Sequence, residues 1–308
     1  MSAHHDLVSS FIPLETSLRG KLRRQPRVNG GMQCLGFNTA EFDWISEVAD
    51  YLTEKKFTDA PLPLETLHTR LSEENKKWIP DNPVNFEHEC AHRPSFQHLY
   101  ERFIRHLGHN VFKRDFLFER TPILRFNFVG DMPDRFRSPS GRVLCYHSDT
   151  LFGDPFEGIN CWLPLITRCY GTNAMAWADL EKSIPILERF SSGVEFDLDT
   201  YNEQGRQRFF ESLCADRAWE EEVVNQCSPL EGTYGELTVF DPRCVHGTME
   251  NDSPTTRVSM DFRLLFVDDE EALHSHWSKR DKAIPVESSD NLSFRRGAFY
   301  DERSAFEL

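Results

Sequence analysis

The chain has 308 residues, of which 39% are hydrophobic, 12% aromatic and 28% charged. Its 25 Phe and 6 Trp residues supply enough bulky apolar side chains to exclude wholesale disorder. Lys and Arg number 35 against 50 Asp and Glu, and the resulting net charge of −15 repels nucleic-acid phosphates and anionic lipids. We therefore expect a folded protein that binds neither nucleic acid nor a membrane.

Targeting signals are weak in this sequence. No apolar run approaches the roughly 20 residues that cross a bilayer, and no basic leader precedes an apolar stretch. The basic residues 19–27 could belong to a transit peptide, a reading that the acidic residues Asp6 and Glu15 disfavour. The 8 cysteines contain no CxxC pair and are typical of buried, reduced thiols. Together these features predict a cytoplasmic protein.

The first third of the chain is expected to be an arm followed by helices. Residues 1–38 mix Gly, Pro and basic residues without a clear period, as in an arm that crosses a surface. Apolar residues then recur at helical spacing from Phe42 to Leu52, with Thr39 as a candidate N-cap, and again over residues 95–107. Residues 39–120 are therefore predicted to form a helical scaffold.

After Arg120 the hydrophobic period changes from helical spacing to two. Short β-rich runs, beginning with TPILRFNFVG, are separated by Gly, Pro, Asn and Asp, which favours an antiparallel sandwich or barrel over residues 121–266. Residues 179–227 interrupt these runs with charged, helix-favouring sequence, a predicted helical insert across one end of the barrel. Residues 267–308 are a polar tail. We expect a single domain that is mainly β, with helical additions.

Three residues near strand ends carry the chemistry. His147 and Asp149 are two positions apart at the end of a strand-like run, so both side chains point to one face. His246 follows another predicted strand. Two imidazoles and one carboxylate form the triad that holds non-haem Fe(II) and leaves coordination positions open.

The predicted strand that begins at Arg257 has two different faces. Arg257, Ser259, Asp261 and Arg263 alternate with Val258, Met260, Phe262 and Leu264. A polar row backed by an apolar row predicts a barrel whose polar interior accepts a charged cosubstrate.

From Pro122 to Phe266 the sequence resembles the Fe(II)/2-oxoglutarate-dependent dioxygenases, especially the phytanoyl-CoA dioxygenase and streptomycin-biosynthesis-type branch. The resemblance rests on HSDTLFGDPFEGINCWLPL, GTNAMAWADLEKS and GELTVFDPRCVHGTMENDSPTTRVSMDFRLL. It implies a double-stranded β-helix, also called a jelly-roll or cupin-like core, with N-terminal helices and a helical insert.

The resemblance also implies a role for each motif residue. His147, Asp149 and His246 would bind iron, and Arg257 would pair with the far carboxylate of 2-oxoglutarate. Thr248, two residues after the distal histidine His246, would assist Arg257 in binding 2-oxoglutarate. Arg125, on an earlier strand, is a further candidate for 2-oxoglutarate binding.

The implied reaction is the oxidation of a small polar metabolite with 2-oxoglutarate and O₂ as cosubstrates, which releases succinate and CO₂. Related halogenases have Gly or Ala in place of the carboxylate, so Asp149 favours hydroxylation, desaturation or ring closure over halogenation. Asn127, Arg263 and Trp162 are candidate substrate contacts. For each of them a structural role is an open alternative: a solvent-facing edge for Asn127, a pair with Asp261 for Arg263, and core packing for Trp162.

Two other functions stay open at this point. The chain could be a metal-binding jelly-roll protein without oxygenase turnover. It could also be a zinc hydrolase that uses the same three ligands, although this reading leaves Arg257 without a role.

Overall fold

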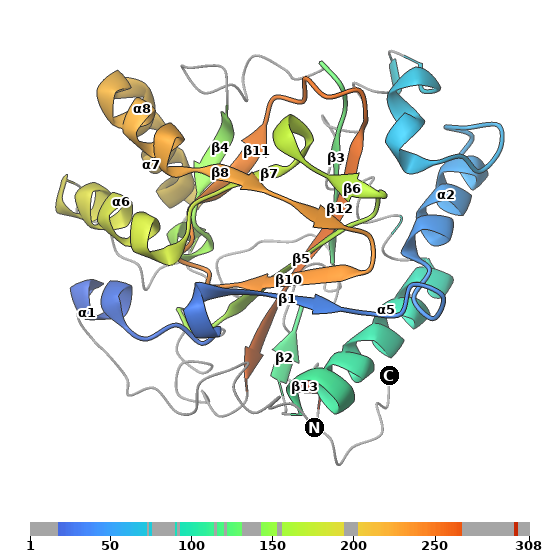
Figure 1. The fold of residues 1–308 in the computed structure, drawn as a ribbon, viewed down its shortest axis with the longest axis horizontal. Helices are drawn as coiled ribbons and strands as arrows, with labels where there is room; N and C mark the ends of the chain where they lie inside the picture. Colours follow the sequence, from blue (N-terminus) through green and yellow to red (C-terminus); the bar gives the residue numbers. More distant parts are fainter. Residues whose placement is uncertain are drawn as a thin grey trace.

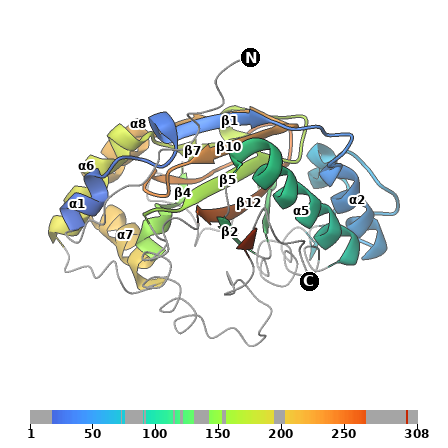
Figure 2. The ribbon, with the colours of Figure 1, turned by 90° about the horizontal axis from the view of Figure 1, so that it is seen from below.

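A computed structural model describes residues 18–72, 74–75, 90, 93–113, 116–119, 122–130, 143–152, 156–193, 203–266 and 299–300. Antiparallel sheets lie at the centre, and two groups of helices flank them on opposite sides (Figure 1, Figure 2). One group contains α2 (Trp44–Glu54) and α5 (Pro94–His106), and the other contains α6 (Leu180–Gly193), α7 (Glu203–Ala215) and α8 (Arg217–Gln226). The predicted combination of antiparallel sheets and helical additions is confirmed.

The larger sheet has seven strands in the order β1-β10-β5-β12-β2-β13, with β3 also paired to β12. Its central strand is the long β12. The bounds are β1 Met32–Gly36, β2 Phe116–Phe118, β3 Ile123–Asn127, β5 Ile159–Pro164, β10 Glu236–Phe240, β12 Arg257–Phe266 and β13 Phe299–Tyr300.

The smaller sheet has four strands in the order β4-β11-β7-β8, and a two-stranded ribbon joins β6 to β9. The bounds are β4 Val143–His147, β6 Arg168–Cys169, β7 Met175–Trp177, β8 Ser228–Leu230, β9 Gly232–Thr233 and β11 His246–Met249. Short helical turns complete the described chain at η1 Asn29–Gly31, η2 Leu64–Thr69, η3 Leu107–Phe112, η5 Asp149–Phe152 and η6 Gly171–Asn173, together with α1 (Leu18–Arg23).

The two faces of β12 differ as its alternation predicts. Val258, Met260, Phe262 and Leu264 are fully buried on the apolar face. The Phe262 ring lies 5.5 Å from Tyr100 and 6.4 Å from Phe103, both on α5. Helix α5 therefore covers the apolar face of the larger sheet, and the polar face of β12 looks toward the metal-ligand candidates.

Helix α2 begins later than its sequence suggests. Thr39 was the expected N-cap, but Asp43 caps the helix, and its carboxylate accepts a hydrogen bond from the Ser46 amide at 3.1 Å. Asp is as strong an N-cap as Thr, and here it directly precedes the first buried residue of the helix, Trp44.

Helices α6, α7 and α8 fall within residues 179–227 and pack on the outer side of the smaller sheet (Figure 1). A second apolar cluster joins them to this sheet. Its members include the buried residues Tyr146, Leu151, Ala176, Ile186, Leu187, Phe190, Phe209, Leu213, Trp219, Val223 and Val245. The insert therefore supports the strands that carry His147 and His246.

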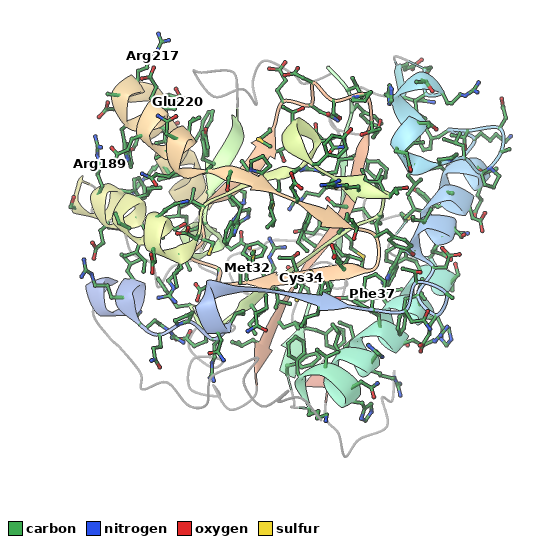
Figure 3. The ribbon with its side chains drawn as sticks, viewed as in Figure 1. Met32, Cys34, Phe37, Arg189, Arg217 and Glu220 are labelled. Carbon is green, nitrogen blue, oxygen red and sulfur yellow. The ribbon has the colours of Figure 1, made fainter. Side chains whose placement is uncertain are left out.

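The expected N-terminal arm is partly sheet. Met32–Gly36 forms strand β1 and pairs with β10 from Met32↔Phe240 to Gly36↔Glu236. Figure 3 shows Met32, Cys34 and Phe37 along this edge of the sheet. A strand of five residues is too short to show a convincing period, which is why sequence reasoning missed it. The predicted arm before Leu18 and the predicted tail after Phe266, apart from β13, lie outside the described residues.

The expectation of buried cysteines is only partly correct. Every cysteine whose side chain the structure describes is free, but Cys34 and Cys214 are exposed. Within the described ranges, no helix combines the length and apolarity that a membrane crossing requires.

Candidate metal centre

Three side chains from neighbouring parts of the smaller sheet meet at one point. His147 ends β4, Asp149 begins η5, and His246 begins β11, where it lies directly across from His147. Nε2 of His147 and Nε2 of His246 lie 3.6 Å and 3.5 Å from Oδ1 of Asp149. One donor atom from each residue lies within 4.8 Å of the others. The arrangement can hold a single metal ion.

The His246 ring is oriented by the backbone. Its Nδ1 lies 2.9 Å from the carbonyl oxygen of Cys244, which can only accept, so Nδ1 carries the proton. Nε2 is then the ring nitrogen left for a metal ion, and this atom faces Asp149. Phe240 packs edge-on against the same ring at 5.5 Å. Such a bond at the far nitrogen is the usual way in which proteins orient a metal-binding histidine.

Asp149 is buried, and its two oxygens have different surroundings. Oδ2 accepts from Nε of Arg263 at 3.0 Å and lies 2.9 Å from Nη2 of the same residue. Oδ1 has no hydrogen-bond partner among the residues that the structure describes. Burial alone would raise the pKa of this carboxyl, but Arg263, His246 and His147 outweigh burial and hold the pKa below its usual range. The residue is therefore a carboxylate with one oxygen left for a ligand.

The donor set fits Fe(II). Two imidazole nitrogens and one carboxylate oxygen match the ligands of non-haem Fe(II) centres, and Oδ1 of Asp149, which lacks a partner among the described residues, is the atom that such an ion would bind. The same donors also suit zinc, so the donor set does not by itself define the reaction.

Arg257 is the second unusual group. It is 2% exposed, and its Nη2 donates to Oγ1 of Thr248 at 3.2 Å. Its Nε and Nη1 find no partner in the described part of the chain. Burial lowers the pKa of Arg257 to about 10. A buried guanidinium is costly unless a partner compensates its charge, which makes Arg257 a candidate anchor for an anionic ligand.

Arg125 and Asn127 share the polar face with Arg257 but have protein partners. Arg125 lies across from Ser259 and donates to Asp261 at 2.7 Å and 3.2 Å, with 43% of its side chain exposed. Asn127 is buried and donates from Nδ2 to the Met249 carbonyl at 3.1 Å, while its Oδ1 is unpartnered within the described ranges. Asn127 is therefore better placed than Arg125 to meet a ligand.

Arg263 and Trp162 are the two remaining candidate substrate contacts, for which the sequence also allowed a structural role. Arg263 contacts the Asp149 carboxylate and also pairs with Asp261 at 3.1 Å. Trp162 is 2% exposed and belongs to the main apolar cluster. Its cross-strand partner is Asp261, so its side chain lies on the polar face of the larger sheet. Trp162 is thus a buried aromatic residue on the face that carries Arg257.

Sequence reasoning missed Asn160. This residue is 4% exposed, and neither its amide oxygen nor its amide nitrogen has a partner in the described structure. Its cross-strand neighbours are Phe240, which contacts His246, and Arg263, which contacts Asp149. The strand sequence INCWLP could have indicated it: Asn160 and Trp162 are two positions apart, so their side chains point to the same face.

Comparison with known proteins gives one curated relative. The chain is 31% identical over 159 residues to the streptomycin biosynthesis protein StrG of Streptomyces griseus. The match covers 51% of this chain and 49% of StrG, so it spans about half the length of each protein. It confirms the resemblance to the streptomycin-biosynthesis type. No protein-family model matches the chain.

Similar solved structures include SnoK, EctD and HygX. The non-heme alpha ketoglutarate dependent carbocyclase SnoK from nogalamycin biosynthesis has 12% identity and a TM-score of 0.38 over 77% of this chain and 80% of SnoK. Iron-bound EctD from S. alaskensis has 14% identity and a TM-score of 0.41 over 85% of this chain and 82% of EctD. Iron-bound HygX from Streptomyces hygroscopicus has 9% identity and a TM-score of 0.39 over 76% of this chain and 82% of HygX.

Proposed function

We propose that the protein is an Fe(II)- and 2-oxoglutarate-dependent oxygenase that oxidises a small polar metabolite. In this proposal the two sheets are a double-stranded β-helix core within a single domain. His147, Asp149 and His246 hold the iron, with the Nε2 atoms of the two histidines and Oδ1 of Asp149 as donors. Bound iron supplies the activation of O₂, coupled to the decarboxylation of 2-oxoglutarate to succinate and CO₂.

The observation that carries the proposal is the buried guanidinium of Arg257, whose Nε and Nη1 have no partner among the residues that the structure describes. It contacts Thr248, which lies two residues beyond His246 on β11, so about 7 Å of strand separates this contact from a metal-ligand position. A dicarboxylate can bind the metal at one end and reach Arg257 with the other. The anchor would form charge-assisted hydrogen bonds through Nε and Nη1, which have no other partner in the described structure.

The polar interior supports a polar substrate. Asn160, Asn127 and Ser259 lie on the face that carries Arg257, and each presents a buried polar atom that has no partner in the described part of the chain. Such atoms favour a ligand that offers hydrogen-bond donors and acceptors over an apolar one. The match to StrG supports a role in small-molecule biosynthesis. Hydroxylation, desaturation and ring closure are all compatible with a carboxylate at position 149.

The first experiment adds Fe(II) and then 2-oxoglutarate to metal-free protein without oxygen. A weak visible charge-transfer band should appear only when both are present, and it should be lost in Asp149→Ala and Arg257→Ala proteins. Iron binding without this band would favour a metal-binding protein that does not use 2-oxoglutarate. Preferential retention of zinc through purification, again without the band, would favour a hydrolase.

A further inference from the structure

Arg263 contacts one candidate metal ligand and two other acids. Its side chain is 14% exposed and lies among the carboxylates of Asp149, Glu119 and Asp261. We propose that Arg263 is a positioning residue of the metal centre, which holds Asp149 so that only one carboxylate oxygen faces the metal. This inference rests on the proposed function and extends it to a residue that the sequence offered as a substrate contact.

Both contacts from Arg263 to Asp149 reach the same oxygen. Nε and Nη2 lie 3.0 Å and 2.9 Å from Oδ2, while Oδ1 lies 3.5 Å from Nε2 of His246. A carboxylate held in this way cannot rotate without breaking the hydrogen bond from Nε and the ion-pair contact with Nη2. Arg263 therefore favours binding through Oδ1 alone, which leaves more coordination positions for other ligands than bidentate binding would.

Arg263 is itself held from the opposite side. Its Nη1 donates to Oε2 of Glu119 at 3.3 Å and to Oδ2 of Asp261 at 3.1 Å. Glu119 is 1% exposed, and its amide donates to the carbonyl oxygen of Arg263 at 3.0 Å, so backbone and side chain both join the two residues. With its three nitrogens engaged by acids, Arg263 has little capacity left for a substrate.

The test is metal binding by Arg263→Gln and Arg263→Lys proteins. Co(II) replaces Fe(II) as the probe, and anaerobic titration of its visible absorption gives the affinity. We expect about 10- to 100-fold weaker binding by Arg263→Gln, the range typical for loss of a group that orients a metal ligand. Arg263→Lys should be intermediate, because it keeps the charge but cannot hold Oδ2 of Asp149 with two nitrogens at once.

Arg189→Gln is the matched control. Arg189 also pairs with two acids, Asp216 at 2.9 Å and Glu222 at 2.7 Å, but it is half exposed at the outer edge of α6 (Figure 3). Its loss should leave Co(II) affinity within about twofold of wild type, because the residue contacts no part of the site. Circular dichroism checks that each variant is folded. If Arg263→Gln does not fold, Arg263→Lys and Glu119→Gln provide the test, since each loosens the same contact.

The Co(II) spectrum separates a positioning role from a merely structural one. A released Asp149 carboxylate changes the coordination of Co(II), so band positions and intensities should shift in Arg263→Gln and not in Arg189→Gln. Folded Arg263 variants with wild-type affinity and spectrum would overturn the inference and leave the proposed function standing. Failure of the wild-type chain to bind Co(II) or Fe(II) would overturn the proposed function itself.

Discussion

The Nη2 atom of Arg257 lies 3.2 Å from Oγ1 of Thr248 and thereby joins the start of β12 to the strand that begins at His246. The contact crosses from the larger sheet to the smaller one. It uses one nitrogen of a buried guanidinium and leaves Nε and Nη1 without partners among the described residues. A cationic anchor is thus fixed close to the candidate metal ligands.

Arg257→Gln should weaken the binding of 2-oxoglutarate and leave metal binding intact. Two charge-assisted hydrogen bonds are lost, each worth roughly 1.5–3 kcal/mol, so the apparent dissociation constant should rise by at least about 100-fold. Titration of the charge-transfer band with 2-oxoglutarate at saturating Fe(II) measures the change. Arg168→Gln, which removes an exposed arginine paired with Glu231, is the control. An unaltered constant in Arg257→Gln would move the anchor to another residue, with Arg125 the next to examine.

His246→Ala should abolish specific metal binding. The residue supplies one of three donors, and its ring is held by the Cys244 carbonyl, so no other side chain can replace it without rearrangement. Anaerobic Fe(II) titration monitored by thermal unfolding checks the expectation: Fe(II) should raise the midpoint of the wild type and not that of the variant. His106→Ala, a change on α5 outside the site, should respond to Fe(II) like the wild type. Normal iron affinity in His246→Ala would rule out the three-residue centre.

The sequence could place His147 and Asp149 on one face because their spacing is local, whereas the distant His246 was proposed from its place after another predicted strand and from the family resemblance. His147 and Asp149 are two positions apart, and the alternation of residue types along β12 separates its polar face from its apolar face. Both inferences need only the period of a strand. The same reasoning placed helices near α2 and α5, because their apolar residues recur every three or four positions.

Contacts between distant strands were beyond sequence reasoning. Arg263 and Asp149 are 114 positions apart, and their contact depends on how the two sheets face each other. The unpartnered amide of Asn160 is equally hidden, since a lack of partners is a property of the packed core. Strand β1 was missed for a related reason: five residues show little pattern until β10 lies beside them.

Asn160→Leu should not destabilise the ligand-free protein. Leucine has the same branched shape as asparagine and replaces a buried amide whose polar atoms have no partner in the described structure, so the free energy of unfolding should stay the same or rise by about 1–3 kcal/mol. Urea denaturation of metal-free protein measures it. Turnover should nevertheless fall, because Asn160 lies between residues that contact His246 and Asp149.

Asn173→Leu is the matched control for this change. Asn173 is also fully buried, but its Nδ2 donates to Thr255 at 2.7 Å and its Oδ1 accepts from the Tyr170 amide at 2.6 Å. Its replacement should cost about 1–3 kcal/mol. A comparable loss of stability in Asn160→Leu would show that the Asn160 amide is satisfied without ligand and would remove its expected role in the site.

Arg243→Met should destabilise the fold, because Arg243 holds the loop between β10 and β11, which contacts the candidate metal ligand Asp149. Arg243 is 0% exposed, and its Nε and Nη2 each lie 2.7 Å from the Asp241 carboxylate. Its Nη1 donates to the carbonyls of Leu22 and Arg24 at 2.8 Å, which ties the end of α1 to the β10–β11 loop. Breaking such a pair leaves Asp241 buried and uncompensated, so we expect a loss of about 3–5 kcal/mol.

The double variant Asp241→Asn/Arg243→Met separates this electrostatic cost from lost packing. It removes the uncompensated charge and should recover part of the stability, whereas Arg217→Met on the exposed face of α8 should cost almost nothing (Figure 3). Pro242 lies between the paired residues, and its carbonyl oxygen accepts a hydrogen bond from the Asp149 amide at 3.0 Å. Because Asp149 is a candidate metal ligand, Arg243→Met should also weaken Co(II) binding. Loss of stability with unchanged Co(II) affinity would show that the loop holds Asp149 without help from the ion pair.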